Sequence, residues 1–239
     1  MNRGQTVSDT KRAFHRAYDR LIAPAYRHVV DELLVELNLL SNQRNFHADP
    51  IFCTGLCQVF DSFMAGYRPT AHLPVLFAAI TAATGLDGED VRRLSNEARN
   101  ATAGQSSELV KVWVASASGA PAVLAEALEA AKTESFHYSR LFAVGLITLI
   151  ESAEGVDTDD AEAAAKAAKE LTTAMGLAGE RVDKDLSLYR SNLEKMAMSL
   201  EVMEEAVAAE RRKRERQEAE ARGTGADGDS VGSAEQGED

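Results

Sequence analysis

The feature that most constrains the fold is a row of apolar residues near the C-terminal end whose spacing alternates strictly between three and four. The row consists of Leu186, Tyr189, Leu193, Met196, Leu200, Met203 and Val207. An α-helix repeats every 3.6 residues, so this spacing places all seven side chains in one stripe along a helix. We therefore predict a long C-terminal helix over 179–222 with coiled-coil character, and we predict that the stripe is an interaction face.

The length of this helix has a consequence of its own. From 180 to 222 it would reach ~60 Å, about twice the width of a small domain, so part of it should project or meet a partner. The spacing is equally compatible with packing against a second chain and with packing against the protein's own body.

The rest of the chain also has the character of a helical protein. Of its 239 residues 45% are hydrophobic and only five are proline, and no segment is a convincing strand. We predict an all-α multi-helix bundle with a helical body over 1–178. Cap residues and apolar periodicity predict body helices that start at Ser8 and cover 25–40, 51–65, 73–84, 109–116, 121–132 and 138–152, one capped by Asp87, and one from Asp159 or Asp160 to about Met175.

The most apolar of these segments, 138–152, is expected at the centre of the core, since a helix that is apolar on nearly every face must be covered on nearly every face. Its longest apolar run, 141–150, has about half of the ~20 residues that a transmembrane helix needs. We therefore expect no transmembrane segment.

Beyond the apolar stripe the sequence becomes charged. A basic cluster is formed by Arg211, Arg212, Lys213, Arg214 and Arg216. Because glutamates alternate with it, the pattern favours a solvated helix end over a patch for anionic lipid or an acidic protein. The last residues, 223–239, are glycine-rich and acidic, so we predict that this tail is disordered.

The chemistry-bearing residues do not form a recognisable catalytic pattern. The net charge of −12 argues against nucleic acid as a partner. Nucleophile-elbow, phosphate-loop and dinucleotide motifs are absent from the sequence, and Glu134 and His137 form a single Glu-x-x-His pair where di-iron bundles use two. We predict no catalytic, cofactor-binding or metal-binding residues, and hence no enzyme.

Two other groups of residues are interpreted as core. Cys53 and Cys57 lie four apart on one helix face and are predicted to be buried thiols. Five aromatic residues would also suit a ligand pocket, Phe46, Phe52, Phe60, Phe63 and Tyr67, but the helical spacing of the last four favours core packing.

Five blocks of sequence carry a specific family resemblance. They are TVSDTKRAF at 6–14, YRHVVDELLVELNLLS at 26–41, DPIF at 49–52, VFDSFMAGYRP at 59–69 and FHYSRLFAVGLITLIE at 136–151. In this order they closely resemble the thylakoid formation protein family, also described as photosystem II biogenesis accessory proteins, over residues 5–210.

The resemblance implies an all-helical, non-catalytic protein of oxygenic phototrophs that supports thylakoid biogenesis and photosystem II assembly and repair. It implies as partners the thylakoid FtsH-type protease complex, whose accumulation the family supports, or photosystem II assembly factors. Plant members carry a transit peptide ahead of the first block. This chain starts almost on that block, so we expect a cyanobacterial protein, cytoplasmic and peripheral to the thylakoid membrane, without signal or transit peptide. The alternative is a membrane-shaping protein that binds anionic thylakoid lipid through its basic C-terminal helix.

Overall fold

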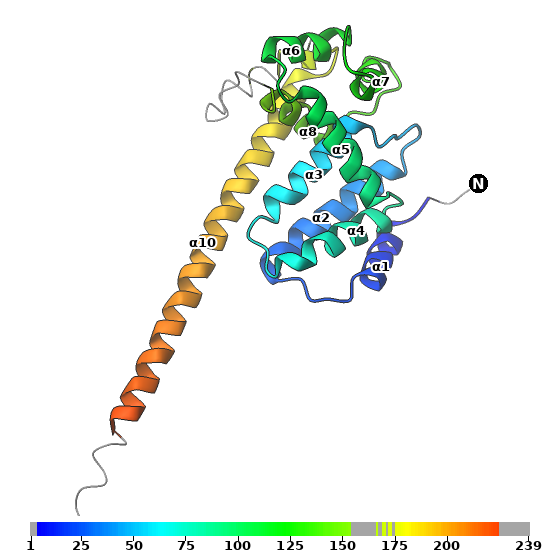
Figure 1. Cartoon of the computed structure of the whole chain (residues 1–239). Coiled ribbons are helices and arrows are strands. Elements are labelled where there is room, and N and C mark those ends of the chain that lie inside the picture. The colour runs from blue at the N-terminus through cyan, green and yellow to red at the C-terminus, as the bar shows by residue number, and fades with distance from the viewer. Residues whose placement is uncertain (1–3, 154–165, 167–168, 171, 174, 225–239) are drawn as a thin grey trace, which may run out of the picture. The chain divides into compact units, whose positions relative to one another are not determined.

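Helices make up all the regular structure in the part of the chain that the computed structural model describes, residues 4–153, 166, 169–170, 172–173 and 175–224 (Figure 1). The predicted all-α multi-helix bundle is therefore confirmed. The predicted helix from Asp159 or Asp160 lies largely outside the described residues, and so does the predicted tail beyond 224. By compactness the chain divides into two units, 1–194 and 195–239.

The first unit contains the body helices. They are α1 (Val7–Ala17), α2 (Pro24–Ser41), α3 (Pro50–Phe63), a short 3₁₀ turn η1 (Thr70–His72), α4 (Leu73–Ala83), α5 (Gly88–Thr102), α6 (Ser107–Ser116), α7 (Ala122–Ala130) and α8 (Arg140–Glu151). The long helix α10 (Gly179–Thr224) begins in the first unit and continues into the second. The predicted long C-terminal helix is thus confirmed.

Most helix starts lie where a polar side chain can cap them. Asp49, Asp87 and Ser139 each accept hydrogen bonds from backbone N–H groups in the first turn of α3, α5 and α8. The predicted start of the first helix at Ser8 is wrong. Thr6 is the N-cap instead, because its hydroxyl accepts the N–H of Asp9 while the Asp9 carboxylate accepts the N–H of Thr6, a reciprocal capping box.

The centre of the core is the packing of α3 against α8. Every residue of α8 from Leu141 to Ile150 is buried, which confirms the prediction for the most apolar segment. Gly55 of α3 and Gly145 of α8 let the two backbones approach each other. A Cβ atom on Gly55 would overlap the carbonyl oxygen of Leu141, and one on Gly145 would overlap that of Ile51.

The other body helices surround this pair in two groups (Figure 1). Helices α1, α2 and α4 pack on one another, and α4 also packs on α5, which lies against α3. Helices α6 and α7 pack on each other at the other end of the unit, where Trp113 joins a buried cluster with Leu128 and Phe142. No described helix is long and apolar enough to cross a bilayer.

Candidate functional site

Helix α10 carries the predicted interaction stripe, and its first four turns are fixed to the body by apolar contacts. Val182 and Leu186 lie one turn apart and are each only 1% exposed. Tyr189 is half-buried, and its ring packs edge-on against Phe63 with centroids 6.0 Å apart. The first residues of the stripe therefore belong to the core of the first unit.

Polar contacts secure the same turns. The Tyr138 hydroxyl donates to Asp185 Oδ2 at 2.9 Å, and the Arg181 guanidinium lies 4.9 Å above the Tyr138 ring. Burial, followed by this hydrogen bond to a carboxylate, raises the pKa of Tyr138. Farther along, Arg190 Nη2 lies 3.9 Å from Glu151 Oε1 of α8. These partners flank α8, so the start of α10 is held to the most buried helix of the body.

The stripe becomes more exposed along the helix. Leu193, Met196 and Leu200 are half-buried, whereas Met203 is 45% and Val207 is 69% exposed. Beyond Leu193, two large apolar residues outside the stripe are also exposed, Met198 at 66% and Val202 at 65%. The sequence reasoning missed this second row because it followed the heptad alone; the i, i+4 spacing of Met198 and Val202 was the available signal. We define the exposed apolar face of α10 as Met198, Val202, Met203 and Val207.

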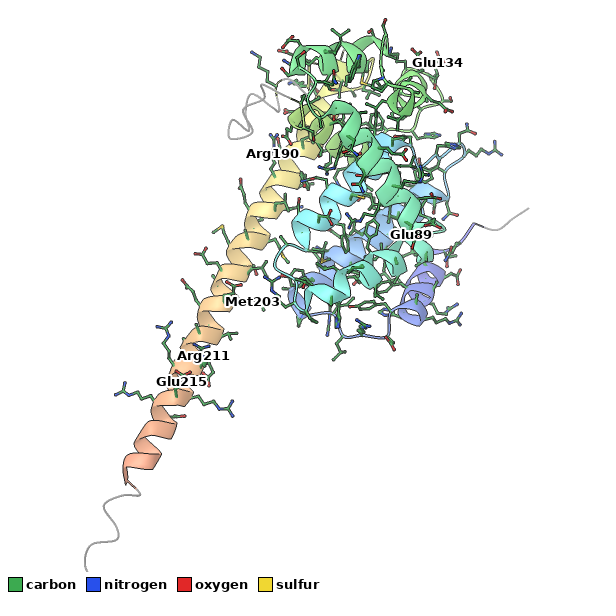
Figure 2. All side chains as sticks on the ribbon, in the orientation of Figure 1. Glu89, Glu134, Arg190, Met203, Arg211 and Glu215 are labelled. Atoms are coloured by element: carbon green, nitrogen blue, oxygen red, sulfur yellow. The ribbon has the colours of Figure 1, made fainter. Side chains whose placement is uncertain are left out.

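The predicted basic cluster lies on exposed turns of α10 beyond this face. Arg211 Nε lies 3.3 Å from Glu215 Oε1, and both side chains project from the same side of the helix (Figure 2). Glu204, Glu205 and Glu210 precede the cluster. These carboxylates reduce the field that the cations present to an anionic surface, because opposite charges within about two turns of a helix partly offset each other.

The remaining chemistry-bearing residues do not converge. Among the residues that the structure describes, no three His, Cys, Asp or Glu side chains lie together as a metal site would need. Cys53 and Cys57 are free and buried, which confirms them as buried thiols. Burial raises the pKa of both, so their reactive thiolate forms are disfavoured.

A cavity of about 680 Å³ opens between the α2–α3 loop, α5, α7 and the start of α8. Two edge-on aromatic pairs line it, Phe46 with Phe52 and Phe136 with Phe142, and His137 lies at its wall. The interpretation of the aromatic residues as core therefore holds for the buried Phe52, Phe60 and Tyr67, while Phe63 is half-buried and Phe46 is half-buried at the cavity. Glu134 is exposed and does not line the cavity.

Asp49 lies at the edge of this cavity and is the N-cap of α3. Its Oδ1 accepts the N–H groups of Ile51 at 2.8 Å and Phe52 at 2.9 Å. Burial nevertheless raises the pKa of Asp49 from 3.8 to about 6. Between these two values the folded chain binds more protons than the unfolded chain, so this group makes the free energy of unfolding decrease as pH rises from about 4 to about 6.

Asp49→Asn is therefore expected to reduce the loss of stability over this pH range. Asparagine caps a helix about as well as aspartate but does not titrate, so the variant should be more stable than the parent at pH 7 by roughly 1 to 2 kcal/mol. The measurement is the free energy of urea unfolding as a function of pH. Asp87→Asn, at the exposed cap of α5, is the matched control for loss of one cap charge. An unchanged pH profile in Asp49→Asn would show that the carboxyl group is not the source.

Comparison with known proteins places this chain in one family, whose likeness covers most of its length. The model of the family "Thylakoid formation protein" matches residues 6–218. Protein Thf1 of Prochlorococcus marinus (strain MIT 9313) is 44% identical over 228 residues, which are 95% of this chain and 94% of that protein. Protein Thf1 of Synechococcus sp. (strain CC9605) is 44% identical over 214 residues, 89% of this chain and 94% of the relative.

The fold is similar to that of a solved structure as well. A structure described as Psb29 at 1.55 Å superposes with a TM-score of 0.76 at 32% identity and covers 87% of this chain and 98% of its own. The chain thus belongs to the thylakoid formation protein family, which is represented in cyanobacteria by the relatives above, has an accessory role in thylakoid biogenesis and photosystem II function, and is not known for catalysis.

Proposed function

We propose that this protein acts at the surface of the thylakoid membrane as a non-catalytic adaptor, and that the exposed apolar face of α10 binds a thylakoid FtsH-type protease complex or a photosystem II assembly factor. The observation that carries the proposal is this face itself. Four large apolar side chains lie exposed along a short stretch of one helix, Met198, Val202, Met203 and Val207. Apolar surface of this extent on a helix is typical of a protein-binding site.

The chemistry of the face supports a protein partner. Methionine side chains are flexible and polarisable, so Met198 and Met203 can adapt to a hydrophobic groove, and an amphipathic helix in a groove is a common mode of recognition. Glu205 is exposed and, at 100° per residue, borders Met198 around the helix, so it would contribute to a polar rim of the interface. Exposed cations on the partner would complement this rim.

The non-catalytic part of the proposal is supported by the dispersion of the reactive groups. The two thiols are buried with raised pKa values. Two histidines line the cavity, His47 and His137, and among the described residues neither belongs to a group of three His, Cys, Asp or Glu side chains that could hold a metal. A role in assembly or repair then depends on binding alone, so loss of the apolar face should abolish function without loss of fold.

Met203→Asp with Val207→Asp is expected to reduce capture of membrane partners at least tenfold, because burying two unpaired carboxylates at an interface costs several kcal/mol. The measurement is affinity capture from cyanobacterial thylakoid membranes with the full chain as bait, read as the amount of FtsH-type protease and photosystem II proteins recovered. Stability should be unchanged, since both residues are exposed.

Ala197→Asp with Ala208→Asp is the matched control. At 100° per residue these positions lie away from the apolar face, and the pair adds the same two charges to the same helix. The control should capture as much as the parent. Recovery of neither protease nor photosystem proteins by the parent chain, or equal recovery by both double variants, would contradict the proposal.

A further inference from the structure

Contacts among three tyrosines join two segments that are far apart in the sequence, the α1–α2 connection and the turn after α3, at one end of the first unit. The Tyr18 and Tyr67 hydroxyl groups lie 3.2 Å apart, and the rings of Tyr26 and Tyr67 pack edge-on with centroids 5.0 Å apart. All three are buried. The connection between α1 and α2 is thereby held against the turn between α3 and η1, and the exposed side chains of both segments share one surface.

This surface is basic although the chain as a whole is acidic. Its arginines are exposed and, among the described residues, none forms an ion pair with a carboxylate; they are Arg16, Arg20, Arg27 and Arg68. Asp19 is the sole carboxylate within residues 14–27 and 64–72. On nearby α1 the cations are neutralised, Lys11 by Asp31 and Arg12 by Asp9. At this end, therefore, four exposed arginines lie without an ion-paired carboxylate among the described residues.

An exposed leucine, Leu21, directly follows Arg20 in this segment. Leu21 is 88% exposed, more than any other exposed large apolar residue that the structure describes. The loop that displays it is not loose, because the next residue, Ile22, is buried and its carbonyl accepts the Nε–H of Arg27 at 3.0 Å. The fold thus keeps the apolar side chain of Leu21 in water beside the arginines, although exposure of apolar surface to water is unfavourable.

We infer that this arginine end, made of Arg16, Arg20, Leu21, Arg27 and Arg68, is a docking surface for an anionic lipid bilayer. Guanidinium groups bind phosphate and sulfonate oxygens through two parallel hydrogen bonds, and a protruding leucine can enter the acyl boundary that a protein or nucleic-acid partner does not offer. None of these five residues lines any of the four pockets described for the chain, so none of those pockets offers a peptide a groove at this end. The inference deepens the proposed function, since it rests on the membrane location given there and names the surface that provides it.

The test is flotation of the full chain with vesicles of phosphatidylcholine, with and without phosphatidylglycerol, at low and high salt. We expect binding to the phosphatidylglycerol vesicles alone and weaker binding at high salt. Arg20→Gln with Arg68→Gln should weaken the apparent affinity about 25-fold, at about fivefold per arginine near an anionic surface. Leu21→Ser should weaken it about tenfold, because it removes the inserted side chain.

Two controls are matched to these variants. Arg44→Gln changes an exposed arginine beyond the other end of α2, and Leu39→Ser changes a 58% exposed leucine of the same helix. Both should float like the parent, and all variants should unfold at the parental temperature. Equal flotation of the parent and the Arg20 and Arg68 double variant would overturn the inference.

A further arm neutralises the basic cluster at Arg211 to Arg216 in α10. If this variant still floats with the vesicles, the result supports the arginine end as the lipid-binding surface. If it no longer floats, while Leu21→Ser and the Arg20→Gln, Arg68→Gln double variant float like the parent, lipid binding belongs to α10 and the inference is refuted. Partner capture by the apolar face of α10 is measured separately in membrane extracts. A failure of either binding surface is therefore distinguishable from a failure of the other.

Discussion

Alanine at Gly55 or Gly145 is expected to destabilise the first unit by about 3 kcal/mol or more, although alanine is the better helix former by about 1 kcal/mol. The contact between α3 and α8 decides whether the substitution stabilises or destabilises the fold. In each variant the new methyl group would overlap a backbone carbonyl of the facing helix, Leu141 for Gly55 and Ile51 for Gly145. A backbone atom cannot rotate away, so the helices must separate along the most buried interface of the body.

The measurement is urea unfolding of each single variant. Gly88→Ala is the control: it also adds a methyl group to a helix, at the first residue of α5, but its nearest neighbour is the Thr81 hydroxyl, a side-chain atom, rather than a backbone carbonyl of a facing helix. The control should stay within about 1 kcal/mol of the parent. Stabilisation of Gly55→Ala or Gly145→Ala, the result that helix propensity alone predicts, would contradict the close approach.

This contact also shows where sequence reasoning about the fold ended. Periodicity and composition predicted an all-helical bundle, and the density of apolar residues in 138–152 identified its central helix correctly. The partner of that helix was not predictable, because the two glycines lie far apart in the chain and a glycine within a helix has no signature of what it faces. The start of the first helix also depends on local hydrogen bonds. Thr6 and Asp9 form a capping box there, so the helix begins two residues before the predicted Ser8 cap would allow.

The candidate sites were predicted in part. The stripe on α10 was visible as a heptad, but burial depends on what the rest of the chain brings near it, so the sequence could not separate the buried Leu186 from the exposed Val207. The arginine end was hidden for a similar reason. Arg68 is more than forty residues from Arg27 in sequence, and their common surface arises from contacts among three buried tyrosines.

Aspartate at Leu186 is expected to lower the free energy of unfolding of the first unit by about 3 to 5 kcal/mol, because it would leave an unpaired charge in a buried site. The same substitution at Val207 should change it by less than about 0.5 kcal/mol, since that residue is 69% exposed. The two positions are three heptads apart, so they are equivalent in the repeat and differ only in surroundings. Thermal and urea unfolding of the two single variants measure the contrast.

The molecular mass in solution then separates the two ways in which the stripe can pack. A coiled coil between two chains would need Leu193, Leu200 and Val207 to face a partner copy, so Val207→Asp would convert a dimer to a monomer and lower the stability of the dimer. Packing on the body alone requires the opposite pattern: a large loss of stability for Leu186→Asp at unchanged mass, and no change of either quantity for Val207→Asp. We expect the second pattern, because Val182, Leu186 and Tyr189 already find their contacts within the first unit and Val207 stays exposed for a membrane partner.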